Sequence, residues 1–135
     1  TYHDPVPLDF EERIHVFELA NLDDLEPDEE GLIVVNGGGI GEISSMADGR
    51  KNCFPDCVLT IEDIDEIFRL VDEALELRDP SRIAKLNLHI PVNTYTEKNE
   101  EILRYFLDGM EGYVESGEIQ WGTQLEVFEA YERVK

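Results

Sequence analysis

An alternating segment near the middle of the chain carries the strongest candidates for chemistry. Within residues 84–92 the apolar and polar side chains fall on opposite faces, Leu86, Leu88 and Ile90 on one and Lys85, Asn87 and His89 on the other. Histidine titrates near neutral pH and can serve as a general acid or base. In α/β proteins, chemistry gathers where a strand ends and a helix follows. We therefore assign His89 as the candidate catalytic residue and Asn87 as a candidate substrate-binding residue; the alternative is a purely structural histidine.

Trp121 is a second candidate for substrate binding. It ends a short expected strand and precedes Thr123, which with Glu126 has the spacing of a capping box. An indole in that place could line a sugar-binding groove. The alternative is an aromatic side chain that belongs to the core or its rim.

A glycine-rich segment, Gly37–Gly41, follows an apolar run and has part of the spacing of a dinucleotide-binding loop. Position 42 is Glu42, where that motif needs a third glycine for close helix packing, and a carboxylate there would repel a pyrophosphate. The segment favours a flexible turn, and we predict no bound cofactor in this chain.

Metal ligands are too scattered to predict a metal site. Cys53 and Cys57 are spaced C-x3-C, whereas zinc and redox motifs use C-x2-C, and the three histidines supply no second ligand pair. His3 beside Asp4 is weak evidence for a metal site, and His3 and His15 are weaker candidates than His89 for acid–base chemistry. We expect unpaired thiols, with a disulfide as the alternative.

The charge of the chain limits its partners. Among 135 residues, 32 acidic side chains face 11 basic ones, for a formal net charge of -21. Nucleic acids and anionic membranes require clustered Lys and Arg, so neither is expected as a partner. A cation or a basic protein would suit this surface. No apolar run approaches the ~18 residues of a membrane span.

Hydrophobic periodicity predicts alternating strands and helices in one domain over residues 1–135. Strands are expected over residues 13–20, 31–35, 84–92 and 118–121. Helices are expected over residues 61–78 and 97–116, between the later strands, and again after Thr123. A long loop is expected over 42–56. Such alternation predicts an α/β fold whose parallel sheet is built from βαβ units.

Local signals mark the expected ends of the helices. Thr60 with Asp63 has the spacing of a capping box at the start of helix 61–78. Thr96 or Thr94 is expected to cap helix 97–116, and Gly117 is expected to end it. The apolar residues of the last helix are Leu125, Phe128 and Tyr131.

From Leu86-Asn87-Leu88-His89 to Tyr131 the chain resembles the C-terminal end of the polysaccharide deacetylase (NodB-like) family and related carbohydrate-active barrels. In that family a late strand ends in Leu-x-His, and a short strand resembling Gly117–Thr123 leads to a closing helix. The resemblance implies the C-terminal half of a (β/α) barrel. It also implies that His89 protonates the leaving group. The family's metal triad has no match in residues 1–83, so the metal site would be missing from this chain.

Two functions follow from these observations. The first is a deacetylase-type hydrolase, in which a divalent metal of the intact barrel would activate water against an N-acetylated glycan. The alternative is a non-catalytic acidic α/β protein that binds a basic partner protein.

Overall fold

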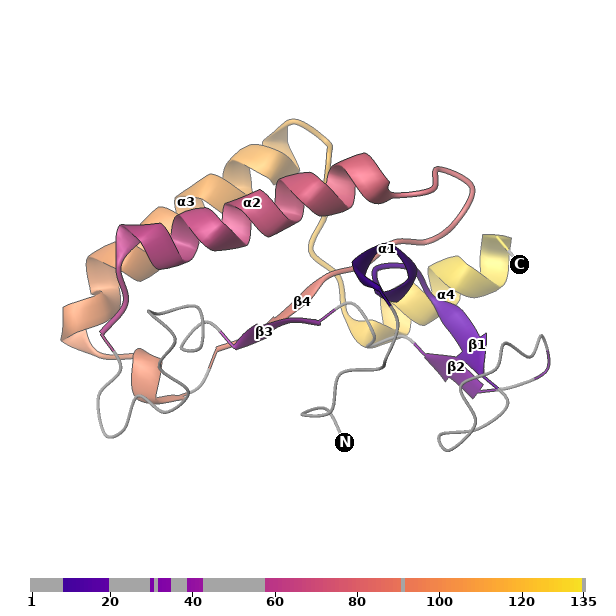
Figure 1. Cartoon of the computed structure of the whole chain (residues 1–135), viewed down its shortest axis with the longest axis horizontal. Coiled ribbons are helices and arrows are strands. Elements are labelled where there is room, and N and C mark those ends of the chain that lie inside the picture. Colours follow the sequence, from indigo (N-terminus) through magenta and orange to yellow (C-terminus); the bar gives the residue numbers. More distant parts are fainter. Residues whose placement is uncertain are drawn as a thin grey trace. The chain divides into compact units, whose positions relative to one another are not determined.

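The computed structural model describes residues 9–19, 30, 32–34, 39–42, 58–90 and 92–134. The chain divides into two units, each described by itself (Figure 1). Cys53, Cys57, His3 and the expected loop 42–56, apart from its first residue, lie outside the described residues. Within the described residues, no helix combines the length and apolar character that a membrane span requires.

The first unit contains α1 (Phe10–Arg13), β1 (Phe17–Leu19), β2 (Leu32–Val34) and α4 (Gln124–Val134). Strands β1 and β2 pair antiparallel, with Phe17 opposite Val34. The segment that follows α2 adds an antiparallel bridge between His15 and Ala84. The core of this unit includes the buried side chains Ile14, Val16 and Phe17.

The second unit contains most of β3 (Gly39–Glu42), of α2 (Ile61–Leu77) and of β4 (Asn87–His89). It also contains the short 3₁₀ turns Val92–Thr94 and Glu97–Asn99, and α3 (Glu100–Glu115). Strands β3 and β4 form a second two-stranded sheet. Helix α2 begins at the predicted capping box, where Thr60 and Asp63 exchange backbone-to-side-chain hydrogen bonds of 2.8 and 3.4 Å. Its buried face has helical spacing: Ile64, Ile67, Val71 and Ala74.

Helices α2 and α3 pack side by side and run in the same direction (Figure 1). Tyr105 donates to Asp65 at 2.6 Å near the start of both helices, and Tyr113 donates to Asp72 at 2.5 Å near their ends. Between these bonds the Phe68 ring lies against α3, beside Gly109. Because the two helices run in the same direction, the chain must return between them, and it does so through the segment that contains β4.

The prediction of a parallel sheet, and with it of half a (β/α) barrel, is wrong. The described chain is mostly helical, and its strands form only short two-stranded pairs. The expected strand 118–121 is absent because the amides of Glu118 and Ile119 bond back to the carbonyl of Tyr113 and close the end of α3. Those donors are therefore not available to a ladder with another strand.

Other strands and helices begin or end at residues different from those expected, for local reasons. The first part of expected strand 13–20 belongs to α1 and its end, because Asp9 accepts from the Glu12 amide at 2.9 Å and starts a helical turn. Of the expected strand 84–92, residues Asn87–His89 form β4, and Ala84 forms the single bridge to His15. Gly39 and Gly41, expected in a turn, lie in β3. Asn99, rather than Thr94 or Thr96, precedes α3.

Candidate functional site

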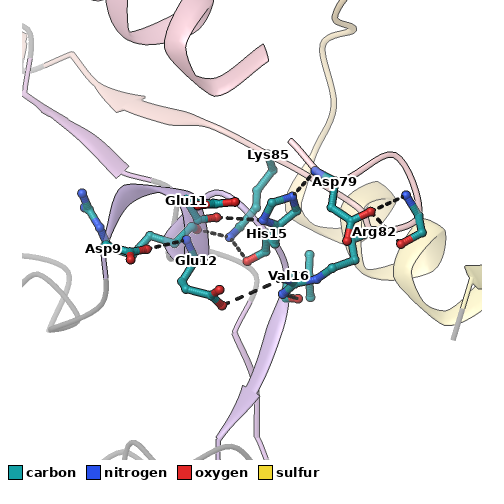
Figure 2. Close-up of polar contacts among 10 residues, drawn as sticks. Asp9, Glu11, Glu12, His15, Val16, Asp79, Arg82 and Lys85 are labelled. Atoms are coloured by element: carbon teal, nitrogen blue, oxygen red, sulfur yellow. Dashed lines mark hydrogen bonds and ion pairs between the residues drawn. The ribbon is translucent and has the colours of Figure 1, made fainter. Parts of the chain in front are cut away.

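A buried histidine joins α1 to the segment after α2 (Figure 2). His15 is 1% exposed, and the Asp79 amide donates to its Nε2 at 2.8 Å. Because an amide N–H can only donate, Nε2 must accept, and the proton is assigned to Nδ1. That nitrogen lies 2.8 Å from the Glu11 carbonyl and donates to it. Both ring nitrogens are thus used to hold two chain segments together.

Lys85 fastens the same end of α1 (Figure 2). Its Nζ donates to the carbonyls of Arg13 and His15, both at 2.7 Å, and its amide donates to the Ile14 carbonyl, also at 2.7 Å. The last carbonyls of a helix have no partner within the helix. The lysine therefore supplies the donors that the end of this short helix needs. We call His15, Asp79 and Lys85 the α1 clamp.

The surroundings of Lys85 disfavour its charge. Burial, with a smaller contribution from the cations of Arg82 and Arg13, lowers the pKa of Lys85 to about 7. A neutral amine still has two N–H groups, enough for both carbonyls. The Nζ also lies 5.6 Å from the centre of the Phe17 ring. An amine that titrates near neutrality could act as a base or nucleophile, but these bonds tie it to the fold, and we assign it a structural role.

Arg82 and Asp79 complete the polar surroundings of the clamp. Arg82 lies 4.0 Å from the Glu12 carboxylate and donates to the Val16 carbonyl at 3.5 Å. The Asp79 carboxylate accepts from the hydroxyl and the amide of Ser81, which lowers its pKa below the ordinary value. These groups are exposed or half-buried, so their contacts fix the local geometry but contribute little to the free energy of unfolding.

The predicted site residues lie as follows. Asn87 and His89 are two residues apart in β4 and therefore project to one face, as expected from the alternation. His89 is exposed at the end of the strand, whereas Asn87 is half-buried and its Oδ1 accepts no hydrogen bond from the described residues. Trp121 lies in the connection between α3 and α4 with 63% of its surface exposed. Nothing in this geometry tests the assigned roles, which stay predictions.

Sequence reasoning missed two buried polar side chains. His15 was only a weak candidate for acid–base chemistry, although it fixes α1, and its partner Asp79 is 64 residues away. Asn99 is also fully buried; it accepts from the Leu59 amide at 2.8 Å and donates to the Thr94 carbonyl at 3.0 Å. The spacing Asp9-x-x-Glu12 was the one local signal for α1.

Metal ligands do not gather in the part of the chain that the structure describes. No group of three or more His, Cys, Asp or Glu side chains there could hold an ion. The divalent metal of the hydrolase hypothesis stays a prediction, as does the absence of other cofactors.

Comparison of the chain with protein-family models, with curated proteins and with solved structures gives no match. The candidate functions therefore depend on the residues and their geometry alone.

Proposed function

We propose that this chain is a non-catalytic binding module for a basic partner protein. The observation that carries the proposal is the charge of α2 and α3. Helix α2 has seven acidic residues and one basic residue, and α3 has five and one, so twelve carboxylates stand against two arginines. Such an excess attracts a cationic partner over several ångströms and raises its rate of association.

Both arginines are already paired within their own helices. Arg69 bonds Glu66 at 2.6 Å and Glu73 at 3.0 Å, and Arg104 bonds Glu100 at 3.0 Å. These pairs leave exposed carboxylates on α3, Glu101 and Glu111 among them, that form no ion pair with any described residue. A partner's lysines and arginines could neutralise them.

The hydrolase hypothesis for His89 remains a prediction. Within the described residues, no observation favours it over the binding module. The strand 118–121, which contributed to the family resemblance, is not formed.

Fluorescence anisotropy with labelled synthetic peptides tests the proposed function. The probes are three 14-residue peptides of equal length: one of Leu and Lys with amphipathic helical spacing, one of Ser and Lys with the same lysines, and one of Leu and Glu. We expect both lysine peptides to bind and the glutamate peptide not to bind. Affinity for the lysine peptides should fall steeply between 50 and 500 mM NaCl, because salt screens exposed charges. Equal binding of the lysine and glutamate peptides, or no binding of either, would refute the proposal.

A further inference from the structure

Helix α4 is amphipathic, yet none of its residues is buried. A helix of this length normally draws its stability from packing an apolar face. Instead, Leu125 is 63% exposed and Phe128 is 36% exposed. The helix therefore presents apolar surface that the described residues leave open to solvent.

Along one stripe of α4, two exposed apolar residues are followed by two carboxylates. Leu125, Phe128, Glu129 and Glu132 stand at positions i, i+3, i+4 and i+7, which share one side of a helix. We call these four residues the α4 stripe. All four are exposed, so the stripe combines two apolar contacts with two negative charges on one accessible face.

Another side of α4 is fastened to its own unit. Tyr131 donates to the Glu18 carboxylate of β1, and Val127 and Ala130 are half-buried on the same side as Tyr131. Since successive helical residues are 100° apart around the axis, the side that contains Tyr131 lies well away from the stripe. The hydrogen bond thus fixes α4 on β1 and leaves the stripe turned outward.

The carboxylates of the stripe differ from the first acidic residue of α4. Glu126 accepts from the Thr123 amide at 2.6 Å, and its own amide donates to the Thr123 hydroxyl at 3.2 Å. Those bonds use Glu126 to start the helix and lower its pKa. Glu129 and Glu132 form no hydrogen bond or ion pair with any described residue, so they remain available to a partner.

We propose that the α4 stripe is the docking surface for a basic amphipathic helix of the partner, with apolar side chains on Leu125 and Phe128 and Lys or Arg on Glu129 and Glu132. This inference rests on the proposed function and adds the contact surface and the partner class. The charge of α2 and α3 would speed encounter, while the stripe would supply the short-range contacts that hold the complex. A second copy fits poorly, because its stripe has no Lys or Arg to pair with Glu129 and Glu132.

The test uses the Leu/Lys peptide described above with four variants of the full chain. Leu125→Ser is matched by Leu107→Ser, a leucine of α3 that is 55% exposed. Glu129→Gln with Glu132→Gln is matched by Glu11→Gln with Glu97→Gln, which removes the same charge from exposed positions outside α2, α3 and the α4 stripe. Circular dichroism checks that each variant keeps its helix content.

We expect Leu125→Ser to weaken binding of the Leu/Lys peptide ~10-fold, since it removes one of the two apolar side chains that the peptide would bury. The α4 glutamine pair should weaken it ~5-fold. Each matched control should stay within about twofold of the wild type. The Ser/Lys peptide should lose affinity with the α4 glutamine pair only.

Other outcomes overturn the inference in distinguishable ways. If all variants and their controls lose affinity equally, the peptide binds diffusely, so the stripe is not the docking surface although the proposed function stands. If the wild type binds neither lysine peptide, the proposed function fails and the inference with it. If sedimentation shows a dimer of the wild type that Leu125→Ser dissociates, a second copy occupies the stripe.

Discussion

At the scale of single residues, the α1 clamp places an amine where its charge is costly and its hydrogen bonds are needed. Lys85 satisfies two carbonyls at the end of a four-residue helix, which is too short to be stable by itself. The same enclosure that aligns the amine also lowers the pKa of Lys85 to about 7. The protonation state of this residue is therefore coupled to folding.

The pH dependence of stability tests this coupling. The unfolded chain keeps the lysine proton up to about pH 10.4, whereas the folded chain releases it near pH 7. Between these values the unfolded state binds more protons, so the free energy of unfolding due to Lys85 rises with pH, by up to ~1.4 kcal/mol per pH unit. Lys85→Met should remove this rise between pH 7 and 9, as measured by urea unfolding at each pH.

Lys98→Met is the matched control, because Lys98 is an exposed lysine of a 3₁₀ turn. Lys98→Met should retain the wild-type slope of the free energy of unfolding against pH. Identical slopes for wild type, Lys85→Met and Lys98→Met would show that Lys85 carries the same charge in the folded and unfolded states. The comparison uses slopes rather than absolute stability, since Lys85→Met also removes two hydrogen bonds.

At the scale of elements, the contact between α2 and α3 depends on a missing side chain. The Phe68 ring lies against Gly109, where an added Cβ would be 2.2 Å from the tip of the ring. The ring cannot move away easily, because its centre lies 5.7 to 6.5 Å from those of Tyr105, Phe106 and Tyr113. A glycine in the middle of a helix costs helix stability, and here that loss permits close packing.

Gly109→Ala should therefore destabilise the protein by about 1–3 kcal/mol, because overpacking outweighs the gain in helix propensity. Gly112→Ala is the matched control on the same helix, since nothing lies within 4 Å of the added Cβ. That variant should be stabilised by about 0.5–1 kcal/mol. Urea unfolding of both variants gives the comparison, and stabilisation of both would mean that the Phe68 ring adapts at little cost.

The end of α3 shows how a local motif overrides a strand pattern. Gly117 has a φ of 80°, which favours glycine, and its amide donates to the Val114 carbonyl at 3.0 Å. The Glu118 amide donates to the Tyr113 carbonyl at 3.1 Å, which completes a Schellman motif. The sequence predicted Gly117 as the helix stop, but the apolar residues after it were wrongly assigned to a strand.

At the scale of the whole molecule, the acidic surface should make stability depend on salt. With a net charge of -21, repulsion between carboxylates opposes the compact state. Screening shortens the reach of that repulsion to ~3 Å at 1 M salt. We expect the urea midpoint to rise between 10 mM and 1 M NaCl. A midpoint that stays constant or falls would mean that the carboxylates are already compensated in the folded state.

The parts of the fold that sequence could predict are those that depend on neighbouring residues. Helices α2, α3 and α4 were expected from apolar spacing and from the capping boxes at Thr60 and Thr123, and the structure confirms them. The sheet depends on partners distant in sequence, and the prediction of a parallel sheet was wrong. An alternating segment such as 84–92 shows which faces differ but not which strand, if any, will pair with it.

The candidate site also has a part that could be predicted from the sequence and a part that could not. The shared face of Asn87 and His89 follows from strand geometry and could be predicted. The α1 clamp could not, because Lys85 and Arg13 are 72 residues apart and neither has a local pattern that points to the other. The apolar spacing of Leu125 and Phe128 was visible in the sequence, but their exposure was not, because exposure is a property of the folded chain.

The α1 clamp also has a consequence for the order of folding. Its bonds connect residues 64 to 72 positions apart, so each must close a long loop before it contributes any free energy. The turns of α2 and α3 need only contacts three or four residues apart and can form first. We expect the clamp to form after the main transition state. Stopped-flow measurements on His15→Ala should then show faster unfolding with a nearly unchanged refolding rate, whereas a comparable change in both rates would place the clamp in the nucleus.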